Sequence, residues 1–114
     1  MLSLDLTHEQ LVALVHATTA ACRARHSHQA MDVHDVLAMR ELGTIADGLA
    51  ALAGNGASNV VRLGARESGT LRQALSEWLD ELERRGWMRE DDHEAAHVAR
   101  HVLDPHGALA GAHA

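Results

Sequence analysis

Lysine, phenylalanine and tyrosine are absent from this sequence of 114 residues, and cysteine and proline each occur once. With Cys22 alone, the chain has no internal disulfide and no Cys-x-x-Cys site, which excludes zinc-finger and thioredoxin-like proteins. Its apolar runs are all shorter than the roughly 18 to 20 residues of a membrane helix. The first residues also lack the charged head and apolar stretch of a signal peptide. We therefore expect a cytoplasmic protein that does not enter a membrane.

The composition predicts one acidic helical domain. Ten arginines against 16 acidic residues give a formal charge of −6, a sign that opposes non-specific binding to nucleic acid. Leucine and alanine favour helices, whereas β-branched and aromatic strand formers are scarce. We expect an all-α fold with a single helical domain over residues 1–104 and a flexible tail over 105–114, because this length supports only one core.

Two amphipathic helices are predicted in the first half of the chain. Thr7 and Gln10 have the spacing of a capping box, so a helix is expected from residue 8 to about residue 25. Asp32 is a good N-cap for a second helix. The buried stripe expected on the first helix is Leu11, Leu14, Val15, Thr18 and Cys22. On the second helix, alternating steps of four and three residues form the seam of a packed helix at Ala38, Leu42, Ile45, Leu49 and Leu52.

A glycine-rich loop over residues 54–69 is expected to join the second helix to the third. Within this loop, residues 60–63 are compatible with a strand, a turn of helix or a tethered loop. The third helix is expected to begin at the cap Ser68 and to end at Gly86. Its expected buried stripe is Leu71, Leu75, Trp78 and Leu82.

The fourth helix is predicted from the cap-like pair Asp91 and Glu94. It should stop before Asp104, because the following proline disfavours helical geometry in the residue before it. About four amphipathic helices in a small bundle, up-and-down or nearly so, are therefore expected.

Three histidines, His93, His97 and His101, follow one another at four-residue steps in the predicted fourth helix. Neighbouring pairs have the spacing of helical zinc, nickel or iron sites. Residues 93–97 also match the His-Glu-x-x-His template and so resemble zinc-dependent proteases. The resemblance implies two metal ligands, with Glu94 polarising the water bound to the metal. Such a protease also needs a third ligand and a substrate-binding strand, and we expect no strand.

A solvated helix face is the simpler interpretation of these three histidines. Each four-residue step rotates the side chain somewhat beyond a full helical turn, so the three side chains do not converge on one point. A helical wheel also places them nearly opposite the apolar residues Ala95, Val98, Ala99 and Val102. We favour the solvated face and keep a divalent-metal site as the alternative.

A second group of potential metal ligands surrounds the connection between the first two helices. It contains His26, His28 and His34, together with Asp32 and Asp35. These nitrogen and oxygen donors suit a divalent metal. Because Asp32 already serves as a helix cap, we favour a surface loop here without a metal.

Residues 71–89, which end in Leu-Glu-Arg-Arg-Gly-Trp-Met-Arg, resemble the last helix and turn of winged-helix DNA-binding domains. The resemblance implies a DNA-binding regulator. However, this helix carries Glu77, Asp80, Glu81 and Glu83, whose charges oppose binding to phosphates. We favour a packed amphipathic helix, and DNA-binding regulation is the third functional hypothesis.

A non-catalytic protein-interaction or oligomerisation module is the favoured function, with a homo-oligomer as the expected assembly. Trp78 and Trp87 are core anchors or interface residues, since a part-exposed tryptophan is a strong interface anchor. The other candidate interface residues are Leu42, Ile45 and Leu49, on the seam of the second helix. We expect no cofactor, no nucleic acid and no catalytic residue; zinc, nickel or iron belongs to the metal-binding alternative.

Overall fold

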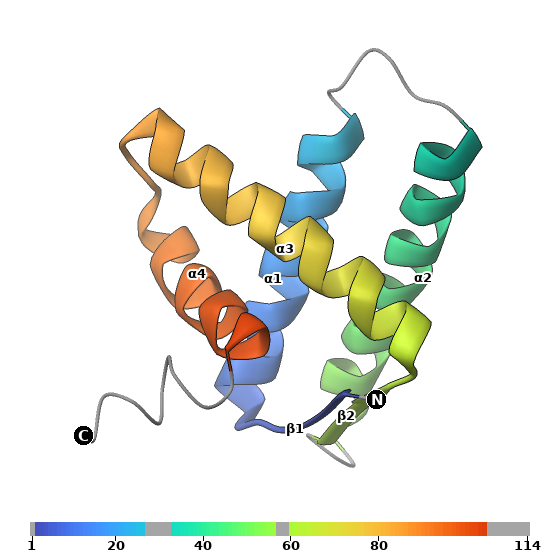
Figure 1. Ribbon diagram of the computed structural model, residues 1–114. Coiled ribbons are helices and arrows are strands. Elements are labelled where there is room, and N and C mark those ends of the chain that lie inside the picture. Colours follow the sequence, from blue (N-terminus) through green and yellow to red (C-terminus); the bar gives the residue numbers. More distant parts are fainter. Residues whose placement is uncertain (1, 27–32, 57–59, 105–114) are drawn as a thin grey trace.

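The computed structural model describes residues 2–26, 33–56 and 60–104 of the chain. These residues form four helices and a two-stranded antiparallel sheet (Figure 1). The elements are β1 (Leu2–Asp5), α1 (His8–His26), α2 (Val33–Asn55), β2 (Val60–Leu63), α3 (Ala65–Arg85) and α4 (Glu90–Leu103). The predicted all-α class is confirmed. The predicted tail over 105–114 and the predicted cap Asp32 lie outside the described residues.

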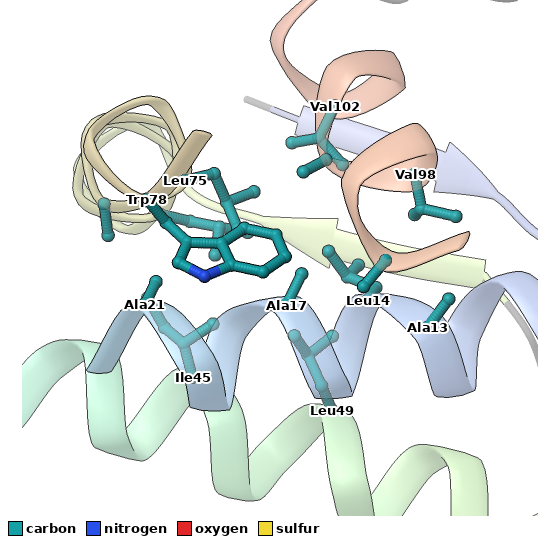
Figure 2. Packing of buried hydrophobic residues seen from close by; sticks show 14 of the residues in the cluster. Ala13, Leu14, Ala17, Ala21, Ile45, Leu49, Leu75, Trp78, Val98 and Val102 are labelled. Atoms are coloured by element: carbon teal, nitrogen blue, oxygen red, sulfur yellow. The ribbon is translucent and has the colours of Figure 1, made fainter. Parts of the chain in front are cut away.

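Helix α1 is the centre of the core, because it packs against each of the other three helices. Its small side chains Ala13, Ala17 and Ala21 are buried and allow neighbouring helices to approach closely. In Figure 2, Trp78 from α3 lies beside α1, near Ala17 and Ala21. Figure 1 shows α3 crossing α1 and α2 obliquely, so the bundle departs from a simple up-and-down arrangement.

The predicted packing stripes lie in this core. On α1, the fully buried members are Leu11, Leu14 and Thr18, whereas Val15 and Cys22 are half-buried. On α2, the buried members are Leu42, Ile45 and Leu49, whereas Ala38 and Leu52 are half-buried. Every predicted member of the α3 stripe is buried. The three-and-four spacing therefore identified the inward faces of these helices correctly.

The small sheet is the main departure from the predicted fold. Strand β1 pairs antiparallel with β2, with Leu4 opposite Val61 and Leu2 opposite Leu63. The expectation that the chain contains no strand was wrong, and residues 60–63 adopt the strand among their three open alternatives. An isolated two-stranded sheet is only marginally stable in water. Burial of Leu4, Val61 and Leu63 against the helices stabilises this short pair of strands.

Two predicted helix boundaries are confirmed in atomic detail. The backbone N–H of Thr7 donates to Gln10 Oε1 at 2.9 Å, and the N–H of Gln10 donates to Thr7 Oγ1 at 3.1 Å. These reciprocal bonds are the capping box of α1. At the end of α3, Gly86 adopts a left-handed conformation with φ of 78° and donates its N–H to the carbonyl of Leu82. Glycine takes this conformation without a Cβ penalty.

Two other predicted caps were wrong. Helix α3 begins at Ala65, directly after strand β2, so Ser68 is a buried residue within the first turns rather than the cap. Helix α4 begins at Glu90. The backbone N–H of Arg89, directly before the helix, donates to the Asp92 carboxylate at 3.3 Å, so Asp92 takes the place predicted for Glu94. The observed N-cap residues are Gly64 for α3 and Arg89 for α4, neither of which is a typical Ser, Thr, Asp or Asn cap.

Candidate interaction surface

The outer face of α2 carries the most exposed cluster of large apolar side chains among the described residues. The exposed fractions are 72% for Val33, 43% for Val36 and 48% for Leu37. Their three- and four-residue spacing places them on one side of the helix. We define the outer face of α2 as the exposed residues Val33, Val36, Leu37, Arg40, Thr44, Asp47, Ala51 and Gly54. This face lies away from the buried seam of the same helix.

Glu41 joins α2 to the first turns of α3. Its carboxylate accepts a hydrogen bond from the Thr70 hydroxyl at 3.2 Å and forms an ion pair with Arg66 at 3.1 Å. Thr70 and Arg66 belong to the first turns of α3. These contacts lie on the Glu41 side of α2, and the residues of the outer face are exposed within the described part of the chain.

Two glycines, Gly43 and Gly48, lie in the interior of α2. A Cβ atom at either position would meet no atom within 4 Å in the described residues, so packing within the chain does not require glycine there. Glycine in a helix interior costs about 0.5–1 kcal/mol relative to alanine. Gly48 is exposed and Gly43 is half-buried, so Gly48 is the position where α2 exposes its backbone to close approach by another helix.

A second exposed aromatic feature is the turn between α3 and α4. Trp87 has an exposed fraction of 57%, and the Arg85 guanidinium lies 4.1 Å from the centre of its ring. Arg85 Nε also donates to the Trp87 carbonyl at 3.2 Å. Beside them is an open groove of about 320 Å³ whose lining includes His16 and Asp92. The cation–π contact fixes the indole at the rim of this groove.

Asp92 ties this turn to α1. Its carboxylate Oδ1 lies 2.9 Å from His16 Nε2, and Oδ2 accepts from the Arg89 N–H. Burial raises the pKa of Asp92, but the hydrogen bonds from His16 and Arg89 and the charges of His16 and Arg85 outweigh it, so that the pKa is lowered. The carboxylate is therefore a structural anion that joins three elements, and its polar contacts account for its burial.

The histidine face of α4 lies where the helical wheel places it. His93 and His97 are exposed and His101 is half-buried, whereas Ala95, Val98, Ala99 and Val102 are buried on the opposite side. The Nδ1 atom of His101 is buried and has no hydrogen-bond partner. Over residues 2–26, 33–56 and 60–104, no group of three or more His, Cys, Asp or Glu side chains is arranged to hold a metal ion.

The second predicted ligand group cannot be placed in the same way. His28 and Asp32 lie outside the described residues, as do the side chains of His26, His34 and Asp35. The surface loop expected there, with metal binding as its alternative, stays a prediction.

The predicted interface residues divide into two sets. Leu42, Ile45, Leu49 and Trp78 are buried in the core of a single chain. Trp87 is exposed and remains available to a partner. The sequence analysis missed Val33, Val36 and Leu37, although a second three-and-four spacing on α2 was present to identify them.

The outer side of α3 has the acidic character that the sequence predicts. Glu77, Asp80 and Glu83 are exposed. Together with Glu81 they line an open groove of about 710 Å³ whose floor includes Trp78. After Gly86 the chain enters α4, at the place where a winged-helix domain would continue into its wing. The charge of this surface opposes contact with phosphates.

Comparison of the chain with family models, curated proteins and solved structures found no match. In the described part of the chain, none of the helices combines the length and apolar character needed to cross a membrane.

Proposed function

We propose that this protein is a non-catalytic interaction module that associates with a second copy of itself through the outer face of α2. The observation that carries this proposal is the exposure of Val33, Val36 and Leu37 on one side of a helix whose opposite side is buried in the core at Leu42, Ile45 and Leu49. Complete burial of a valine or leucine side chain contributes about 1.5–3 kcal/mol. In a symmetric pair each residue is buried twice, which makes this face an effective site for association.

Three side chains of types common in catalysis, His16, Asp92 and Cys22, have structural roles that support a non-catalytic function. His16 and Asp92 join α1 to the start of α4, and Arg85 completes their polar contacts. Cys22 is half-buried in the packing stripe of α1. A buried thiol in apolar surroundings behaves as a small packing residue.

The assembly state of the full chain tests the proposal. Sedimentation equilibrium over a range of concentrations should show a dimer for the wild type and a monomer for Leu37→Glu. Val12→Glu is a matched control, because Val12 has the same exposed fraction as Leu37, 48%, but lies on α1. Circular dichroism should show the same helix content in all three proteins. A monomeric wild type, or equal effects of the two substitutions, would overturn the proposal.

Divalent-metal binding by α4 is the second candidate function. It is favoured by the exposure of both His93 and His97 at the spacing that two ligands on one helix require. A zinc, nickel or iron ion held by this pair needs further ligands from His101, from residues outside the described part, or from a second chain. Its test is given in the Discussion.

A further inference from the structure

We infer that two copies of the chain pair α2 against α2 in the antiparallel direction, with the two-fold axis beside Thr44. This inference rests on the proposed self-association and adds its geometry. It assigns specific contacts across the interface: Leu37 packs against Ala51 of the second copy, and Arg40 faces Asp47 of the second copy. The same contacts recur on the other side of the axis, as two-fold symmetry requires.

The spacing of the outer face gives the first argument. From Val33 to Gly54, exposed residues recur at alternating steps of four and three, at Val33, Leu37, Arg40, Thr44, Asp47, Ala51 and Gly54. This is the repeat of a helix that packs along a second helix at a shallow angle. The buried seam of α2 has the same repeat and packs within the chain. Helix α2 therefore carries two such seams, and only one has a partner in the described residues.

The sizes of the side chains give the direction. Large residues, Val33 and Leu37, lie at the N-terminal end of the outer face, and small residues, Ala51 and Gly54, lie at the C-terminal end. A parallel pair would place large residues opposite large ones at one end and leave a gap at the other. An antiparallel pair places Val33 and Leu37 opposite the small residues Gly54 and Ala51 at both ends of the interface. Even packing along the interface favours the antiparallel direction.

The charges on the outer face agree with that direction. Arg40 and Asp47 are both exposed, and within the described residues neither side chain has a hydrogen-bond or ion-pair partner. They lie at nearly equal distances on either side of Thr44. An antiparallel pair therefore brings Arg40 of each copy to Asp47 of the other, whereas a parallel pair aligns Arg40 with Arg40 and Asp47 with Asp47. Complementary charges at such positions set helix orientation.

Gly48, an exposed residue one turn from Thr44, lies beside the outer face near the proposed axis, whereas Gly43 is half-buried on the opposite flank of α2. Neither glycine is required by packing within the chain, since an added Cβ would meet no described atom within 4 Å. Small residues at a crossing point let two helix backbones approach closely. Gly48 supports the geometry, whereas the apolar and charged residues carry the inference.

Charge exchange in the full chain tests the pairing. Arg40→Asp and Asp47→Arg should each weaken the dimer by about tenfold, because each change replaces two attractive contacts with two repulsive ones. The double variant R40D/D47R should restore the dissociation constant to near the wild-type value. Glu94→Arg, an exposed charge reversal on α4, is the control and should leave the dimer unchanged.

Cross-linking gives an independent measure of direction. In a Cys22→Ala background, an equal mixture of Leu37→Cys and Ala51→Cys proteins should oxidise to the mixed disulfide rather than to either homodimer. Homodimeric disulfides at position 37, or a double variant R40D/D47R that does not recover, would overturn the antiparallel pairing. If Leu37→Glu still abolishes the dimer in that case, the proposed function stands and only the geometry fails. If the wild type is monomeric, both fail.

Discussion

The imidazole Nε2 of His16 and the carboxylate Oδ1 of Asp92 lie 2.9 Å apart, although the two residues are 76 positions apart in the sequence. This contact joins the middle of α1 to the first turn of α4. The same carboxylate accepts the N–H of Arg89 and lies 3.6 Å from the Arg85 guanidinium. The buried Asp92 carboxylate therefore holds the α3–α4 turn against α1, and its removal should weaken the packing of these elements.

Replacement of Asp92 by alanine should destabilise the protein by about 1–3 kcal/mol at neutral pH, because several donors lose a charged acceptor. The measurement is urea unfolding followed by circular dichroism. Asp91→Ala is the matched control, since Asp91 is an exposed neighbour in the same helical turn. Equal losses for the two variants would contradict the role given to Asp92.

The lowered pKa of Asp92 predicts how its contribution depends on pH. A carboxyl group whose pKa is lower in the folded than in the unfolded state stabilises the fold fully above its unfolded pKa. That contribution is lost as the pH falls through the folded pKa. The stability difference between wild type and Asp92→Asn should therefore shrink under acidic conditions. A difference that stays constant from neutral pH to pH values below the folded pKa would contradict this prediction.

The two tryptophans should differ strongly in their contributions to stability. Trp78→Ala removes a buried ring from between α1 and α3 and should cost about 3–5 kcal/mol. Trp87→Ala removes an exposed ring and its contact with Arg85, so we expect a loss of about 0.5–1 kcal/mol. Chemical unfolding of both variants measures the difference. Similar losses would show that Trp87 is packed more tightly than its exposure indicates.

Gly48→Ala should have opposite effects on folding and on association. In the monomer, alanine should stabilise α2 by about 0.5–1 kcal/mol, since the added Cβ meets no described atom within 4 Å. In the proposed dimer, the same methyl group separates the two helices and weakens association. Thermal unfolding at low concentration and sedimentation equilibrium measure the two effects separately. Stronger association of this variant would argue against close helix approach at Gly48.

Metal analysis distinguishes the two candidate functions. We expect untagged protein to contain well below one metal ion per chain by elemental mass spectrometry, because His93 and His97 lie on a solvated helix face. The native mass of the assembly should be recorded on the same sample. Near-stoichiometric zinc, nickel or iron that disappears in the double variant H93A/H97A, with its helix content unchanged, would establish the metal-binding alternative.

Some features of this protein were determined by short-range sequence patterns. The capping box of Thr7 and Gln10 and the left-handed Gly86 depend on contacts within a few residues, and they are present as predicted. The inward faces of α1, α2 and α3 were also predictable, because residues three and four apart share one side of a helix wherever that helix is packed.

Other features were decided only by the tertiary structure, because they depend on partners distant in the chain. Strand β1 exists because β2 lies beside it, and Asp92 is buried because α1 brings His16 to it. Helix α2 is the clearest case: its sequence carries two seams of the same repeat, and the positions of α1 and α3 determine which one is covered. Periodicity specifies the sides of a helix, whereas the arrangement of the other helices selects the side left for a partner.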